Sequence, residues 1–327
     1  MNAGAAHWTA LYLVPVTGVL RDVVREETPP GLTVLLLDSD SPDELARKLP
    51  LADALLVADS AVTAEVVQEA ARLKLVQHQG VGHEKIDKPA LKKAGVTLAL
   101  CPAGTAEGVG EHTVTLILAV LKRVVDAHNS MVSGQWKMWE LRPTTRDLAG
   151  KTVGQFGFGR TGRAAAKRLK GFDIRLIACD PYITLTEAER AQYGVTLVDK
   201  QTLLREADIV CCHVPLNDET RHLIGRPELE QMKRSAVLIN VSRGGVIDQD
   251  AVIEALRTRR IMAGGFDVFS PEPLPAGHPF AALDNVVLTP HVAAGTLDAY
   301  RSKMRFALGN IARAMRGEEP LEQVVVE

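Results

Sequence analysis

The sequence predicts an α/β protein with two doubly wound parallel-sheet domains. Short runs rich in leucine and β-branched residues alternate with segments of helical periodicity, and the alternation occurs twice along the chain. Parallel strands need a crossover connection, usually a helix, so this alternation is typical of parallel sheets covered by helices. The chain has 327 residues, enough for two domains of about 100–200 residues each.

The first series of strand-like runs lies between residues 9 and 101, in the order TALYLV, TVLLLD, ALLVAD, KLVQHQ and VTLALC. A long helical pattern then extends from Ala106 to Met131, and it is longer than most helices that pack beside one sheet. We therefore expect the first parallel sheet to end before Ala106 and the long helix to connect two domains.

The second series begins at Lys151, with the runs VGQFGFG, DIRLIACD, DIVCCHVP, AVLINVSR, GGFDVF and NVVLTPHV. A last amphipathic pattern covers about residues 296–315 and is followed by Gly317, a residue typical of helix C-termini. The sequence therefore predicts a second parallel sheet, a terminal helix and no further regulatory domain.

Composition and charge exclude several kinds of partner. The chain has 38 Lys and Arg against 40 Asp and Glu, a net charge of −2, so it has no basic field for a nucleic acid. No apolar run approaches the roughly 18 residues of a membrane span, and the N-terminus lacks the basic region of a signal peptide. The four cysteines form no CxxC pair and no metal-ligand spacing. We expect a soluble cytoplasmic protein with no bound metal.

A glycine-rich loop joins the first strand of the second series to a helix. It reads Gly157-Phe158-Gly159-Arg160-Thr161-Gly162. In a GxGxxG loop the first glycine permits the tight turn, the second lets the backbone approach a pyrophosphate, and the third allows close packing of helix on strand. The helix N-terminus also offers unpaired N–H groups to the anion. This context predicts a dinucleotide-binding site.

Asp180 follows Gly162 by 18 residues, at the end of the next strand. A carboxylate at that place accepts hydrogen bonds from the ribose hydroxyls of NAD, and its charge repels the 2′-phosphate of NADP. No arginine follows in DPYITLT. We therefore expect NAD, with NADP disfavoured.

Beyond the glycine loop, motifs over nearly the whole chain resemble those of the D-2-hydroxyacid dehydrogenase family. The matching segments are GVGHEKID at 80–87, VGEHT at 109–113, GFGRTG, CDPY, HVPLNDETRHLI at 213–224, NVSRGGVID at 240–248, DVFSPEPL at 267–274 and TPHVAAGT at 289–296. The resemblance implies a discontinuous, flavodoxin-like substrate domain of residues 1–105 and 297–327. It also implies a Rossmann NAD-binding domain of residues 106–296, and a homodimer.

Three residues match the catalytic positions of that family: Arg243, Glu272 and His291. Reduction of a 2-oxo acid places negative charge on the carbonyl oxygen, so a positioned acid must supply a proton, as His291 would near neutral pH. A carboxylate on the imidazole, the role assigned to Glu272, favours its charged form. Arg243 can bind the substrate carboxylate and polarise the oxo group. Taken singly, each could instead be a structural residue.

The resemblance also implies further contacts. Asp267 would bind the nicotinamide carboxamide, and backbone N–H groups of Val81 and Gly82 would hold the substrate carboxylate. The other expected cofactor contacts are Gly157, Gly159, Arg160, Thr161, Gly162, His213, Pro215, Thr220 and Val241.

The substrate stays open, because this chain departs from commoner residues at Thr105, His83 and Lys85. Glyoxylate, hydroxypyruvate, phosphoglycerate and longer 2-oxo acids all remain candidates. Glu272 argues against the formate-oxidising branch, whose members carry an amide there. Trp136 or Trp139 could reach a neighbouring subunit, or could anchor their own loop. The alternative to an enzyme is an NAD(H)-sensing binding protein like the corepressor relatives.

Overall fold

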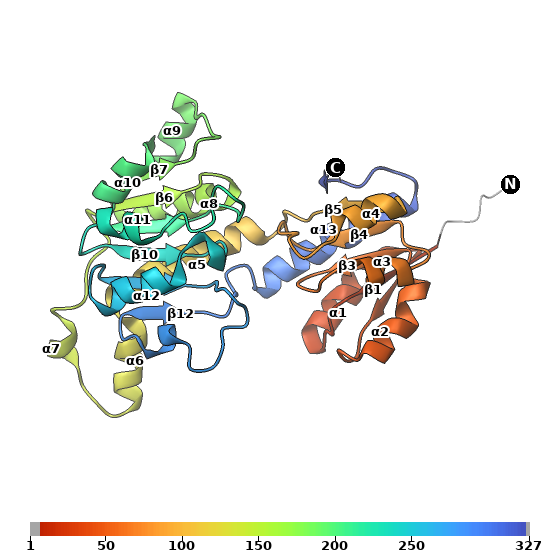
Figure 1. The fold of residues 1–327 in the computed structure, drawn as a ribbon, viewed down its shortest axis with the longest axis horizontal. Helices are drawn as coiled ribbons and strands as arrows, with labels where there is room; N and C mark the ends of the chain where they lie inside the picture. The colour runs from red at the N-terminus through yellow and green to blue at the C-terminus, as the bar shows by residue number, and fades with distance from the viewer. Residues whose placement is uncertain (1–6, 325–327) are drawn as a thin grey trace. The chain divides into compact units, whose positions relative to one another are not determined.

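The computed structural model describes residues 7–324, which form two compact units (Figure 1). The first unit contains the described residues up to Thr105 and those from Thr296 onward, and the second contains Ala106–Gly295. Each unit has a parallel sheet with helices on both faces, which confirms the predicted fold class.

The first unit has a six-stranded sheet among its described residues, in the order β13-β5-β4-β3-β1-β2. Only β13 runs antiparallel, pairing with β5. The order of β1 to β5 is that of a flavodoxin-like sheet. The strands are β1 (Trp8–Tyr12), β2 (Leu32–Leu36), β3 (Ala54–Val57), β4 (Leu75–His78), β5 (Thr97–Ala99) and β13 (Gln323–Val324).

Helices cover both faces of this sheet. Val23 of α1 and Met304 of α13 belong to the apolar cluster on one face, whereas Val67 of α3 and Leu91 of α4 belong to the cluster on the other. The terminal helix expected near residues 296–315 is therefore part of the first unit. The helices are α1 (Gly18–Glu27), α2 (Pro42–Lys48), α3 (Ala64–Glu69), α4 (Lys88–Ala94) and α13 (Leu297–Met315), with a 3-10 turn at Leu49–Leu51.

The second unit has a seven-stranded, wholly parallel sheet in the order β12-β11-β10-β9-β6-β7-β8. Strand order reverses between β6 and β9, which is the point where doubly wound sheets bind ligands at their carboxyl edge. The strands are β6 (Thr152–Phe156), β7 (Arg175–Cys179), β8 (Val195–Leu197), β9 (Ile209–Cys212), β10 (Val237–Asn240), β11 (Ala263–Phe266) and β12 (Val286–Leu288).

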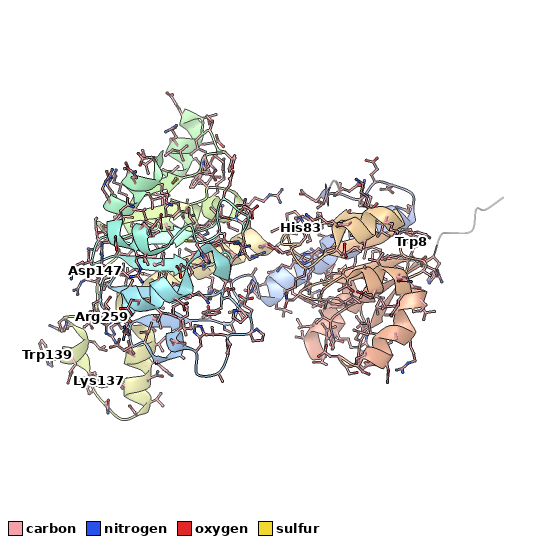
Figure 2. All side chains as sticks on the ribbon, in the orientation of Figure 1. Trp8, His83, Lys137, Trp139, Asp147 and Arg259 are labelled. Atoms are coloured by element: carbon pink, nitrogen blue, oxygen red, sulfur yellow. The ribbon has the colours of Figure 1, made fainter. Side chains whose placement is uncertain are left out.

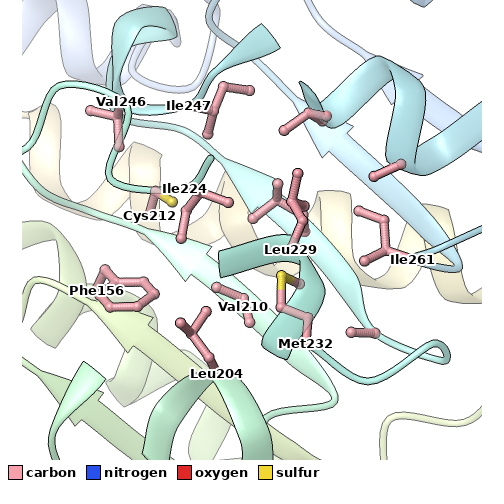
Figure 3. Close-up of a cluster of buried hydrophobic side chains, with 14 of the residues drawn as sticks. Phe156, Leu204, Val210, Cys212, Ile224, Leu229, Met232, Val246, Ile247 and Ile261 are labelled. Carbon is pink, nitrogen blue, oxygen red and sulfur yellow. The ribbon is translucent and has the colours of Figure 1, made fainter. Parts of the chain in front are cut away.

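Two apolar clusters hold helices against this second sheet. Leu204, Leu229 and Val252 belong to the cluster that covers one face (Figure 3), and Leu116 and Leu169 belong to the cluster on the other. The helices are α5 (Thr105–Lys122), α6 (Val124–Val132), α7 (Met138–Leu141), α8 (Arg160–Leu169), α9 (Glu187–Tyr193), α10 (Lys200–Glu206), α11 (Arg226–Gln231) and α12 (Gln249–Arg257), with 3-10 turns at Lys170–Phe172, Gly244–Val246 and Pro279–Ala282.

The single helix expected between Ala106 and Met131 is instead two helices, so that expectation is wrong. Arg123 has φ +51, a left-handed conformation that ends α5 before α6 begins. Its side chain donates to the Asp126 carboxylate and to the carbonyl of Asp284, and these contacts hold the break. The α6–α7 segment, residues 124–141, extends away from the sheet with Trp139 exposed (Figures 1 and 2).

No helix among residues 7–324 is long and apolar enough to cross a membrane. Within the same residues, no group of His, Cys, Asp and Glu side chains has the arrangement of a metal site.

Candidate active site

The expected site residues of the second unit follow the carboxyl ends of its strands. His213 follows β9, Arg243 follows β10, Asp267 follows β11 and His291 follows β12. Since the carboxyl ends of parallel strands meet at one edge of the sheet, residues that are distant in sequence gather there.

The glycine loop between β6 and α8 has the shape that a dinucleotide requires. Gly157 has φ +87, which a residue with a side chain rarely adopts. A Cβ on Gly162 would lie 2.4 Å from the Gly157 carbonyl oxygen, so only glycine lets α8 start this close to the strand. The Cβ position of Gly159 faces open space, and α8 begins directly after it at Arg160. The residues therefore fit a pyrophosphate at the helix N-terminus.

Asp180 closes the loop from the neighbouring strand, β7. Its Oδ2 accepts a hydrogen bond of 2.8 Å from the N–H of Phe158, and its Oδ1 accepts one of 3.0 Å from the N–H of Tyr182. These bonds fix the carboxylate beside the glycine loop, as a ribose-binding acid would need to be.

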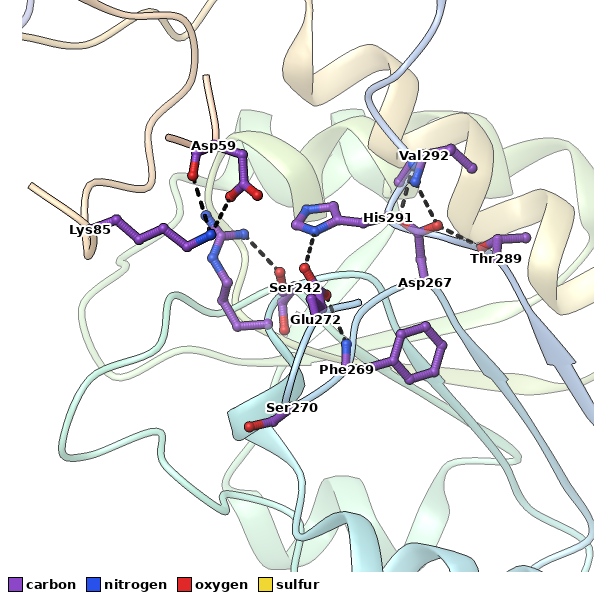
Figure 4. Close-up of polar contacts among 12 residues, drawn as sticks. Asp59, Lys85, Ser242, Asp267, Phe269, Ser270, Glu272, Thr289, His291 and Val292 are labelled. Atoms are coloured by element: carbon purple, nitrogen blue, oxygen red, sulfur yellow. Dashed lines mark hydrogen bonds and ion pairs between the residues drawn. The ribbon is translucent and has the colours of Figure 1, made fainter. Parts of the chain in front are cut away.

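His291 and Glu272 form a hydrogen-bonded pair (Figure 4). Nδ1 of His291 is 2.7 Å from Oε2 of Glu272, and Oε1 of Glu272 accepts a 2.8 Å bond from the N–H of Phe269. The bond from Glu272 raises the pKa of His291 above its usual value, although partial burial and the positive charge of Arg243 oppose the shift. The two side chains remain 50% and 34% exposed, so the imidazole is available to a ligand.

Arg243 lies immediately before the turn Gly244–Val246. Its Nη1 donates a 2.8 Å hydrogen bond to the carbonyl of Ser242, and its backbone carbonyl accepts one of 2.9 Å from the Asn240 side chain. Its charge acts on His291, since it lowers the pKa of that imidazole. The structure thus brings Arg243, Glu272 and His291 together within the second unit.

Asp267 is fully buried and binds the loop that carries His291. Its Oδ1 accepts hydrogen bonds from the Thr289 hydroxyl at 2.6 Å and the Val292 N–H at 2.9 Å, and its Oδ2 accepts one from the Ala293 N–H at 2.9 Å. Burial opposes ionisation, but these bonds and one from His112 outweigh it and hold the pKa of Asp267 below its usual value. Asp267 is therefore an ionised anchor for this loop.

His213, Pro215 and Thr220 lie in the loop after β9. The Thr220 hydroxyl donates a 2.6 Å bond to the Pro215 carbonyl, which folds the loop back on itself. His213 is only 8% exposed, and neither of its ring nitrogens has a hydrogen-bond partner among the described residues. Burial lowers its pKa to about 4, so this imidazole is neutral near pH 7.

The remaining expected residues are distributed between the units. Val241 is buried directly after β10, in the second unit. Val81 and Gly82 follow β4 in the first unit, where the Val81 side chain is exposed and its carbonyl contacts Nδ1 of His83 at 3.2 Å.

Comparison with known proteins decides the family. Residues 114–293 match the family model described as D-isomer specific 2-hydroxyacid dehydrogenase, NAD binding domain. The chain is 40% identical over 283 residues to a glyoxylate reductase of Thermofilum pendens, which covers 86% of this chain and 83% of the relative. The chain belongs to the D-isomer specific 2-hydroxyacid dehydrogenase family.

Other members of the 2-hydroxyacid dehydrogenase family support the assignment. A hydroxypyruvate reductase of Thermotoga maritima is 36% identical, over 79% of this chain and 83% of the relative. The apo structure of D-lactate dehydrogenase from Escherichia coli superposes with a TM-score of 0.86 at 28% identity, covering 97% of this chain and 99% of the other. This dehydrogenase is therefore an oxidoreductase with a nicotinamide cofactor, and the corepressor-like alternative is not favoured.

The structure connects one further residue of this dehydrogenase, His112 in the VGEHT segment, to the site. Nε2 of His112 lies 2.9 Å from the Thr289 hydroxyl and 3.4 Å from Oδ1 of Asp267. His112 lies in the segment VGEHT and Thr289 in the segment TPHV, yet nothing in the spacing of these segments indicates that the two residues are in contact.

Replacing Glu272 by glutamine is expected to move the alkaline limb of the pH–rate profile for 2-oxo acid reduction to lower pH. With His291 as the expected proton donor, reduction needs the protonated imidazole, so we expect its rate to fall as pH rises through the pKa of His291. Glu272 raises that pKa, and the amide cannot, so the fall begins earlier in the variant. Steady-state kcat/KM against pH measures the shift. Glu254→Gln, on the exposed side of α12, is the matched control; coincident profiles for wild type and Glu272→Gln would contradict the prediction.

Proposed function

We propose that the chain interconverts a small 2-oxo acid and its D-2-hydroxy acid with NADH, through Arg243, Glu272 and His291. The observation that carries the proposal is the 2.7 Å pair of His291 and Glu272 at the same sheet edge as the glycine loop. The nicotinamide cofactor, when bound, supplies or accepts the hydride. We propose the second unit as the NAD-binding domain and the first as the substrate domain.

In this proposal His291 moves the proton. Glu272 occupies Nδ1, so Nε2 is the nitrogen that donates to the substrate oxygen as negative charge develops there. Glu272 stabilises the imidazolium before the transfer, and it fixes the ring orientation afterwards. In the oxidation direction the neutral ring takes the proton back.

In this proposal Arg243 binds the substrate carboxylate and polarises the adjacent oxo group. Its planar guanidinium presents parallel N–H donors, which match a carboxylate and its adjacent oxo group. We propose that backbone N–H groups of Val81 and Gly82 also bind the substrate carboxylate. The proposed cofactor contacts remain Gly157, Gly159, Arg160, Thr161, Gly162, Asp180, His213, Pro215, Thr220, Val241 and Asp267.

A panel of 2-oxo acids with NADH and NADPH tests the function. We propose glyoxylate and hydroxypyruvate as the first substrates to examine, because relatives that carry those names match most of the chain. Consumption of NADH, followed by absorbance, is the expected result. A folded protein that leaves NADH unchanged with every member of the panel would overturn the proposal.

Replacing Asp180 by alanine is expected to raise the ratio of kcat/KM with NADPH to kcat/KM with NADH by about tenfold or more, because it removes the ribose acceptor and the repulsion of a 2′-phosphate together. Kinetics with the two cofactors, side by side, give this ratio. Asp250→Ala, at an exposed acid in the first turn of α12, should leave it unchanged. Equal use of both cofactors by the unmodified protein would refute the role of Asp180.

We also propose a homodimer formed through the α6–α7 segment. Large apolar side chains are exposed along it, with Val132 74% and Trp136 73% accessible, and an apolar patch of this kind marks an interaction surface. Light scattering of Trp136→Ser/Trp139→Ser should show a lower mass than wild type; an unchanged mass would contradict this.

We propose that the protein works in the cytoplasm. The four cysteines, all within the described residues, are unpaired, which supports a reducing compartment. Cell fractionation that finds the protein in the cytoplasmic fraction is the expected result.

A further inference from the structure

The peptide that presents His291 is held in an unusual conformation. His291 has φ +53, in the left-handed region that residues with side chains seldom adopt. Such conformations persist only where the surrounding contacts fix them. Three bonds to the Asp267 carboxylate come from residues on either side of His291, and the His291 N–H donates a 2.8 Å bond to the Asp267 carbonyl. The orientation of the imidazole therefore depends on where Asp267 lies.

His112 binds this anchor from α5. The Thr289 hydroxyl gives its proton to Asp267, so its oxygen accepts the hydrogen bond of 2.9 Å from Nε2 of His112. The same nitrogen lies 3.4 Å from Oδ1 of Asp267. The Nε2–H group of His112 thus contacts both Thr289 and Asp267, the two residues joined by the 2.6 Å hydrogen bond.

Gly108, one turn before His112, brings the backbone of α5 against the same loop. A Cβ at Gly108 would lie 2.8 Å from the carbonyl oxygen of Ala293 and 3.3 Å from the Cα of Ala294. Residues four apart on a helix share a face, so Gly108 and His112 contact the loop together. The loop that carries His291 is therefore packed on α5 at two points.

We propose that His112 is a positioning residue for His291, acting through Thr289 and Asp267 to hold the imidazole against Glu272. The inference rests on the proposed function, in which His291 transfers the proton. His112 itself touches neither His291 nor Glu272 in any described hydrogen bond, so its effect is indirect. It is a role that the sequence motif VGEHT did not reveal.

Kinetics of three variants of the full chain test the positioning role. His112→Leu removes the Nε2 donor and should lower kcat about tenfold, because small displacements of a reacting group are costly. His112→Gln, whose side-chain amide can donate from a similar place, should restore most of the rate. Thr115→Val is the matched control, since among residues 7–324 the Thr115 hydroxyl bonds only to the carbonyl of Glu111 on its own helix.

A proton NMR titration of the His291 ring, assigned with His291→Ala, gives a readout that needs no turnover. Glu272, Arg243 and Asp267 are the charged groups that act on this ring. His112→Leu should lower the His291 pKa towards its ordinary value, because a displaced ring loses part of its bond to Glu272. The titration decides the positioning role even if wild type reduces no 2-oxo acid, an outcome that refutes only the proposed function.

A folded His112→Leu with wild-type kcat and an unshifted His291 titration would overturn the inference. If His112→Leu does not fold, Thr289→Val removes the same bridge with a side chain of similar size and is measured in the same way. Wild-type kcat and titration in that variant would overturn the inference equally.

Discussion

Replacing His291 by alanine is expected to lower kcat for 2-oxo acid reduction by about 10²–10⁴-fold, the usual contribution of a positioned general acid. In the variant, water can still protonate the developing alkoxide. Unlike the His291 imidazolium, however, that water is not oriented by Glu272, and Glu272 does not stabilise a protonated form of it. Binding of NADH, measured by fluorescence titration, should change little, because the glycine loop and Asp180 are on other strands of the sheet.

The exposed His7 provides the control for the His291 substitution, since it contacts only the Thr33 hydroxyl in the described hydrogen bonds of the first unit. His7→Ala should retain wild-type kcat. A fall of less than about tenfold in His291→Ala, with the fold intact by circular dichroism, would contradict a role in proton transfer.

Replacing Arg243 by lysine is expected to lower kcat/KM for the 2-oxo acid by about 10²-fold, although the positive charge is kept. An ammonium group is a point charge, so it cannot bind carboxylate and oxo oxygens with two parallel donors. The loss should fall on both the KM for the 2-oxo acid and kcat, since in the proposed function the guanidinium binds the substrate and also stabilises the charge that develops on its oxygen.

The pH dependence distinguishes Arg243 from a purely structural arginine. The Arg243 charge lowers the pKa of His291, and a shorter or displaced cation lowers it less, so the alkaline limb of Arg243→Lys should lie at slightly higher pH. Arg257→Lys, at an exposed position paired with Glu254 on α12, is the control. A wild-type kcat/KM in Arg243→Lys would contradict the proposal that the Arg243 guanidinium binds the 2-oxo acid through two parallel N–H donors.

Much of the second unit could be predicted from sequence because the residues of its glycine loop are close together in the chain and Asp180 follows on the adjacent strand. Gly157, Gly159 and Gly162 lie within six residues, and the close backbone approaches at Gly157 and Gly162 require the glycines that the sequence shows. Asp180 follows at the end of the next strand, and adjacent parallel strands place their carboxyl ends together. The sequence pattern therefore predicts correctly which residues lie close together where they stand at the carboxyl ends of neighbouring strands, as the glycine loop and Asp180 do.

Long-range contacts could not be predicted in this way. His112 meets Thr289 across 177 positions of the sequence, and only the packing of α5 on the sheet brings them together. The break at Arg123 is similar, because helical periodicity continues through it and the contact with Asp284 that holds it is distant in sequence. The short strand β13 has two residues, too few for any periodic signal.

The return of the chain to the first unit imposes an order on folding during synthesis. Met304, Leu308 and Ile311 of α13 fill one face of the first sheet, and β13 adds its edge strand beyond β5. These residues emerge from the ribosome after all of Ala106–Gly295 has been made. The core of the inserted unit can therefore form while the N-terminal sheet still exposes the apolar surface that α13 later covers.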